Sequence, residues 1–151
     1  MTFAKRLERD KSVFLVDRDL GAKAVPETLR EVGCAVEVHA DHFPGEAPDH
    51  AWIKTAGERG WFVLTHDDRI RYNPLSKKAV LAGKVGVFIV AVKGKDVNGK
   101  LLARTVADAA TRMRDFITKN DRPFFAKIHR GGTVTKVDDT PARLRARRSS
   151  S

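Results

Sequence analysis

Two short apolar runs that end abruptly in acidic residues constrain the fold of this chain most. Residues 13–16 (VFLV) are followed by Asp17 and Asp19, and residues 61–65 (WFVLT) are followed by Asp67 and Asp68. Runs of this length are typical of strands that are buried on both faces of a parallel sheet. The carboxyl ends of parallel strands meet at one edge of the sheet, where ligands bind. The two runs therefore predict a cluster of carboxylates at one sheet edge.

Helix-like and strand-like segments alternate along the rest of the chain. Helices are predicted at residues 23–32, 49–60, 74–82 and 102–119, and further strands at residues 34–39 and 85–92. Residues 124–129 and 133–137 flank a pair of glycines, which suits a tight turn between two strands. This order predicts an α/β protein, a three-layer α/β/α fold with a mostly parallel central sheet and a terminal β-hairpin.

One folded domain is predicted, spanning residues 13–138. Residues 1–12 are expected to form a basic N-terminal arm, and residues 139–151, with four arginines and three final serines, a disordered basic tail. The sequence contains no signal-peptide core and no apolar stretch near the ~20 residues of a membrane span. A cytoplasmic protein without membrane contact is expected.

The charge balance is strongly positive. Lys and Arg number 29 against 19 Asp and Glu, which gives a formal net charge of +10. Such an excess indicates a polyanionic partner, most often nucleic acid, although solvated surface residues and the basic tail explain part of it. The remaining body is still positive. Acids at a sheet edge with cations around them are the pattern of a nuclease.

Five acidic residues are candidate ligands of a divalent metal ion. Asp17 and Asp67 lie at corresponding ends of two strands, and Asp49 lies at the start of a predicted helix. These three are the candidate catalytic residues, since neighbouring carboxylates repel one another unless a cation lies between them. Asp19 and Asp68 could complete the metal shell, bind it through water, or face solvent. Turn formation and helix capping are the alternative roles for such residues.

The surrounding residues refine this prediction. Oxygen ligands favour Mg²⁺ or Mn²⁺. Thr65 precedes Asp67 by two residues and so shares its side of the strand, where its hydroxyl would orient the carboxylate. The histidines near this edge have no spacing typical of a zinc site and are predicted to lie in loops or on the surface: His39, His42, His50 and His66.

Four basic residues flank the acids in the sequence: Arg18, Lys23, Arg69 and Arg71. They are predicted to bind RNA phosphates, and the alternative is that they neutralise the acids when no metal is bound. Tyr72 is the only aromatic residue close to the acids, and no base-reading motif is evident.

The acidic positions also match a family pattern. An apolar strand ends in Asp17 and is followed by Leu20, Asp49 precedes a helix with apolar residues at 52 and 53, and a second strand ends in Thr65-His66-Asp67. With this pattern the chain resembles the PIN-like nucleases, in particular the VapC-type toxins of bacterial toxin–antitoxin pairs, over about residues 13–137. These variants often carry another Asp two residues after the Thr-x-Asp acid, where this chain has Arg69.

The resemblance implies a function for the whole chain. It implies a metal-dependent ribonuclease that acts on tRNA or rRNA and is blocked by a cognate antitoxin. It leaves open the exact RNA, the number of metal ions and whether the chain forms a homodimer.

Two alternatives come from other classes. A response-regulator receiver domain would be phosphorylated at Asp67 and would use a lysine at the position of Lys127. Against it, Lys127 is followed by Ile rather than Pro, and residues 89–93 contain no hydroxyl side chain. A non-catalytic PIN-like module that only binds RNA or a partner protein is the second alternative.

Overall fold

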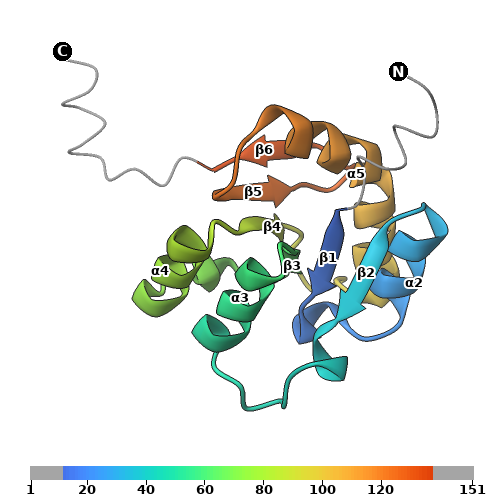
Figure 1. Ribbon diagram of the computed structural model, residues 1–151. Helices are drawn as coiled ribbons and strands as arrows, with labels where there is room; N and C mark the ends of the chain where they lie inside the picture. The colour runs from blue at the N-terminus through green and yellow to red at the C-terminus, as the bar shows by residue number, and fades with distance from the viewer. Residues whose placement is uncertain (1–11, 138–151) are drawn as a thin grey trace.

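The computed structural model describes residues 12–137, which form a six-stranded sheet between two layers of helices (Figure 1). The strand order is β2-β1-β3-β4-β5-β6. The first five strands run parallel and β6 pairs antiparallel with β5. The strands are β1 (Val13–Val16), β2 (Ala35–Val38), β3 (Phe62–Thr65), β4 (Gly86–Val90), β5 (Phe124–Ile128) and β6 (Val134–Lys136).

Two helices cover each face of the sheet. Apolar residues of α2 (Ala24–Glu31) and α5 (Gly99–Lys119) pack on one face, around the rings of Phe14, Phe62 and Phe88. Those of α3 (Asp49–Glu58) and α4 (Pro74–Gly83) pack on the other, against Leu15 and Val63. Consecutive residues of each buried strand thus serve opposite cores, which explains why the strand sequences are apolar throughout rather than alternating. The predicted three-layer α/β/α fold and the terminal hairpin are confirmed.

The loops after the strands differ from the prediction. Three short 3₁₀ helices, η1 (Arg18–Leu20), η2 (His39–Asp41) and η3 (Asp68–Arg71), begin within three residues of the ends of β1, β2 and β3. The longest helix begins at Gly99 rather than near residue 102, because the Asn98 side chain accepts a hydrogen bond from Leu101 N–H at 2.9 Å and caps it. The predicted tail at residues 139–151 and all but the last residue of the predicted arm lie outside the described residues.

No helix within residues 12–137 is both long enough and apolar enough to cross a membrane.

The topology places the two acid-ended strands side by side. Strand β1 pairs with β3 in the register Phe14–Phe62, Leu15–Val63 and Val16–Leu64. Asp17 N–H continues this ladder and donates to Leu64 O at 2.9 Å. The carboxylate that ends β1 is therefore brought next to Thr65, at the end of β3.

Candidate active site

The Thr65 hydroxyl is the centre of the site. Thr65 is completely buried, and its Oγ1 lies 2.9 Å from Asp17 Oδ2 and 3.1 Å from Asp19 Oδ2. One hydroxyl proton is thus shared by two carboxylates. The same oxygen accepts a hydrogen bond from Asp67 N–H at 3.1 Å, and His66 N–H donates to both oxygens of Asp19. The turn after β3 therefore holds both acids of the turn after β1.

The carboxylates of Asp17 and Asp19 both have raised pKa values. Burial and the charge of Asp19 raise the pKa of Asp17 to about 6, although hydrogen bonds from Thr65 and from Arg18 N–H act in the opposite direction. The pKa of Asp19 is raised as well, because partial burial outweighs the hydrogen bonds that it accepts from His66 N–H and Thr65. Two acids with raised pKa values at one sheet edge form a site that a cation would stabilise.

Asp67 is ionised and already paired with a cation. Its carboxylate accepts hydrogen bonds from Arg69 Nε at 2.9 Å and Arg69 Nη2 at 3.0 Å, and from Arg69 N–H at the start of η3. The Arg69 side chain lowers the pKa of Asp67. This side chain is 87% exposed. The departure from the family pattern at position 69 thus puts an exposed cation on the carboxylate that follows β3.

Asp49 lies at the start of α3, on the same side of the molecule. Trp52, fully buried one turn later, donates from its indole nitrogen to Asp49 Oδ1 at 3.1 Å. After burial and Asp19, the charge of Asp49 also contributes to the raised pKa of Asp17. The structure therefore groups Asp49 electrostatically with Asp17, and a buried ring fixes its carboxylate.

Asp68 has a different set of partners. Arg71 Nε donates to Asp68 Oδ1 at 2.8 Å, and Lys127 Nζ lies 4.0 Å from the same oxygen. Although partial burial acts to raise it, the pKa of Asp68 is lowered by Arg71 and the nearby lysines. The structure thus compensates Asp68 with cations and does not join it to the group around Thr65.

The predicted phosphate-binding residues fall into different situations. Arg69 is paired with Asp67 and Arg71 with Asp68, which is the neutralising role given above as the alternative to phosphate binding. The Arg71 side chain is only 13% exposed. Arg18 has no carboxylate partner in the described interactions: its Nε donates to His39 Nδ1 at 2.9 Å and its Nη2 to Phe43 O at 2.7 Å. Lys23 is exposed at the start of α2.

Two histidines, His39 and His66, form hydrogen bonds between distant segments that the sequence did not predict. His39, predicted to lie in a loop or on the surface, is only 2% exposed and packs edge-on against Trp52 at 5.2 Å between ring centroids. Burial and the charge of Arg18 lower its pKa, so the neutral ring accepts from Arg18. His66 Nε2 lies 2.7 Å from Val92 O and ties the end of β3 to the end of β4. Both contacts are between distant segments, which spacing alone does not reveal.

A pre-formed metal cage is not present in the described part of the chain: no three His, Cys, Asp or Glu side chains within residues 12–137 are already gathered at metal-binding positions. The donor chemistry nevertheless fits a hard divalent cation, since the grouped residues are all carboxylates and those of Asp17 and Asp19 carry uncompensated charge when ionised. Arg69 currently occupies the carboxylate of Asp67. A cation that used Asp67 would have to displace it.

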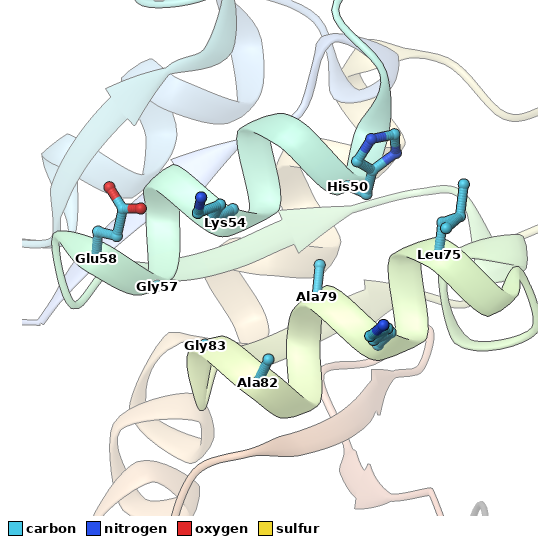
Figure 2. Close-up of a pocket in the computed structure, with 9 residues that line it drawn as sticks. His50, Lys54, Gly57, Glu58, Leu75, Ala79, Ala82 and Gly83 are labelled. Atoms are coloured by element: carbon cyan, nitrogen blue, oxygen red, sulfur yellow. The ribbon is translucent and has the colours of Figure 1, made fainter.

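An apolar groove lies elsewhere, between α3 and α4 (Figure 2). It has a volume of about 540 Å³, and His50 and Leu75 line one end of it. At the other end the helices approach closely, since a Cβ at Gly57 would meet Gly83 O at 2.9 Å. His50 follows Asp49 in sequence, but none of the carboxylates grouped around Thr65 lines the groove.

Comparison with known proteins identifies the family of this chain. A model of the PIN like domain family matches residues 12–92, the segment that contains all the acids described above. The chain is 30% identical over 131 residues to "Putative ribonuclease VapC45" of Mycobacterium tuberculosis (strain ATCC 25618 / H37Rv), a match that covers 83% of this chain and 91% of that protein. No solved structure matches the chain significantly.

The family match also argues against the receiver-domain alternative. The order β2-β1-β3-β4-β5 is shared with receiver domains, so topology alone does not exclude them. Asp67, the residue that would be phosphorylated, is bound by Arg69, while Lys127 lies beside Asp68. The family model and the relative both point away from a receiver domain. The chain therefore belongs to the PIN-like domain family and is a VapC-type member of it.

Proposed function

We propose that this protein is a metal-dependent endoribonuclease and the toxin of a toxin–antitoxin pair. The observation that carries the proposal is the pair of carboxylates, Asp17 and Asp19, that share the buried Thr65 hydroxyl and have raised pKa values. Neighbouring carboxylates with raised pKa values repel each other when ionised, and groups of this kind cluster at functional sites. The family and the VapC-named relative support the same conclusion.

Asp17, Asp19, Asp49 and Asp67 would hold Mg²⁺ or Mn²⁺, with Asp17, Asp49 and Asp67 as the catalytic carboxylates. When bound, such an ion lowers the pKa of a water molecule that attacks the phosphodiester and offsets the charge that builds up on the phosphate. Thr65 orients two of the carboxylates, and Trp52 orients Asp49. Asp68, compensated by Arg71 and Lys127, has no part in the proposed metal shell.

RNA would approach over the basic residues around this edge. Arg18 is held beside the acids by His39 and the Phe43 carbonyl, so its guanidinium is oriented before any substrate arrives. Lys23 and Arg69 are exposed and can reach phosphates. Phosphate contacts of this kind hold the substrate without reading its sequence. The RNA class, tRNA or rRNA, is proposed from the family alone.

A cognate antitoxin would block the site by presenting a cation to the same carboxylates. The pairing of Arg69 with Asp67 supports this idea, because it demonstrates that a guanidinium fits one of these acids. Co-expression with a small neighbouring reading frame should yield a copurifying complex that no longer cleaves RNA.

The direct test is cleavage of labelled tRNA and rRNA by the purified full chain. We expect no cleavage in EDTA and full recovery on adding excess Mn²⁺ or Mg²⁺. Cleavage that persists in EDTA would refute the metal dependence. RNA binding without cleavage under any metal condition would favour the non-catalytic module instead.

A second prediction concerns Arg69. Because Arg69 competes with metal for Asp67, Arg69→Ala should tighten Mn²⁺ binding, by roughly two- to fivefold for an exposed ion pair. Titration calorimetry or Mn²⁺ electron paramagnetic resonance measures this without RNA. Arg112→Ala is the matched control, since Arg112 is exposed on α5 and contacts only the carbonyl of Asp108 among the described interactions. Equal affinities of wild type and Arg69→Ala would show that Arg69 does not compete with metal.

A further inference from the structure

One exposed aromatic side chain lies close to the acids and has no place in the site described so far. Tyr72 ends η3, the short helix that begins directly after Asp67, and its side chain is exposed, with the residue 59% accessible. A 3₁₀ helix rises about 2 Å per residue, so Tyr72 lies about 10 Å along the chain from Asp67. Neighbouring nucleotides of one strand can span such a distance.

The ring is held in place from one side. The Arg71 guanidinium carbon lies 4.1 Å from the centre of the Tyr72 ring, and Arg71 Nη2 donates to the Tyr72 hydroxyl. Arg71 is itself fixed by two hydrogen bonds to Asp68 and is almost buried. One face of the ring is thus backed by an immobilised cation, and the high exposure of the residue leaves the ring accessible from solvent.

The charges around the ring favour an anionic chain as its partner. The single carboxylate of Asp68 is surrounded by Arg71, Lys127 and Lys93, so the group carries a net positive charge. Arg69 is exposed on the side of the acids, and its charge is paired with Asp67, so this net charge rests on Arg71 and the two lysines. An ordered aromatic ring within a positive surface is the usual composition of a site for single-stranded nucleic acid, where bases stack on the ring and the cations bind the backbone.

We infer that Tyr72, backed by Arg71, is a stacking site for an unpaired nucleobase next to the cleaved phosphodiester. The inference rests on the proposed ribonuclease function and adds to it a contact with a base. It commits the site to single-stranded or looped RNA, because a base within a duplex is not free to leave its neighbours and stack on a side chain.

The test compares binding of two probes to the full chain in EDTA, which prevents cleavage. One probe is a labelled 12-mer of single-stranded RNA and the other a ribose-phosphate 12-mer without bases. Tyr72→Ala should weaken RNA binding about 5- to 150-fold, the usual range for the loss of one stacked base, and leave the abasic probe unaffected. Tyr72→Phe should bind like wild type, because the ring is kept.

Leu75→Ala is the matched control. Leu75 is exposed to the same degree, 58%, and lies in the first turn of α4, but an aliphatic side chain offers no ring for a base. Wild-type affinity of Tyr72→Ala, an equal loss with the abasic probe, or an equal loss in Leu75→Ala would overturn the stacking site. A Tyr72→Ala protein that keeps its RNA affinity and loses only a copurifying partner protein would overturn it as well.

If wild type neither binds nor cleaves RNA in Mn²⁺, the proposed function fails together with the inference. If wild type cleaves RNA and Tyr72→Ala binds it normally, only the inference fails.

Discussion

Asp17→Asn is expected to reduce metal-dependent RNA cleavage by at least about 10²- to 10³-fold, the loss typical when one preorganised electrostatic group is removed from an active site. Asn keeps the shape and can still accept the Thr65 hydrogen bond, but it removes the negative charge that a cation requires. The measurement is single-turnover cleavage of labelled RNA in Mn²⁺.

A control substitution separates this effect from a general change of charge. Asp121→Asn alters an exposed acid in the turn after α5 and should cleave at the wild-type rate. Wild-type activity of purified Asp17→Asn would remove Asp17 from the catalytic residues.

Asp17→Asn is also expected to stabilise the metal-free protein at pH 7. The folded-state pKa of Asp17 is about 6 against 3.8 for the free side chain, so the folded protein binds more protons than the unfolded chain between these values. The contribution of Asp17 to the free energy of unfolding should therefore fall as the pH rises from about 4 to about 6. A pKa difference of one corresponds to about 1.4 kcal/mol, and partial solvent access reduces the total gain to about 1–3 kcal/mol.

Urea unfolding in EDTA across this pH range tests the prediction. Asp17→Asn should be more stable than wild type at pH 7, and the difference in free energy of unfolding between the two proteins should grow between pH 4 and 6. Asp67 does not interfere, since its pKa is lowered and its contribution is lost only below pH 4. Mn²⁺ should raise the unfolding temperature of wild type more than that of the variant. An Asp17→Asn protein less stable than wild type at pH 7 would contradict the raised pKa of Asp17.

The 3₁₀ helices after β1 and β3 decide which acids come together, and the sequence did not predict them. Side-chain alternation holds along an extended segment and does not continue into a 3₁₀ helix, which has three residues per turn. Asp19 is two residues from Asp17 and joins it at Thr65, and Arg69 is two residues from Asp67 and binds it. Asp68 directly follows Asp67 and is turned to Arg71 and Lys127 instead. Because both turns depart from extended backbone, the spacing of the acids did not reveal that Asp19 joins Asp17 while Asp68 is bound by Arg71.

The burial of His39 was not predictable in this way. Its position results from packing against Trp52 and Phe43, with ring centroids 5.2 and 5.0 Å away, and from its hydrogen bond with Arg18. These partners come from α3, the loop before it and η1. The local pattern of apolar and polar residues contains no information on contacts between segments so far apart in the chain.

The sequence by itself determined the elements and the edge at which the acids gather. Strand length, helical spacing and the abrupt change from apolar to acidic residues are local properties, and the direction of a parallel sheet then brings the strand ends together. Only the tertiary structure decided which charges meet: Asp17 and Asp19 at one hydroxyl, Asp67 with Arg69, and Asp49 with Trp52. The strength and sign of each interaction depend on distances of a few ångströms and on burial, and both arise from strand order and helix packing rather than from the residues alone.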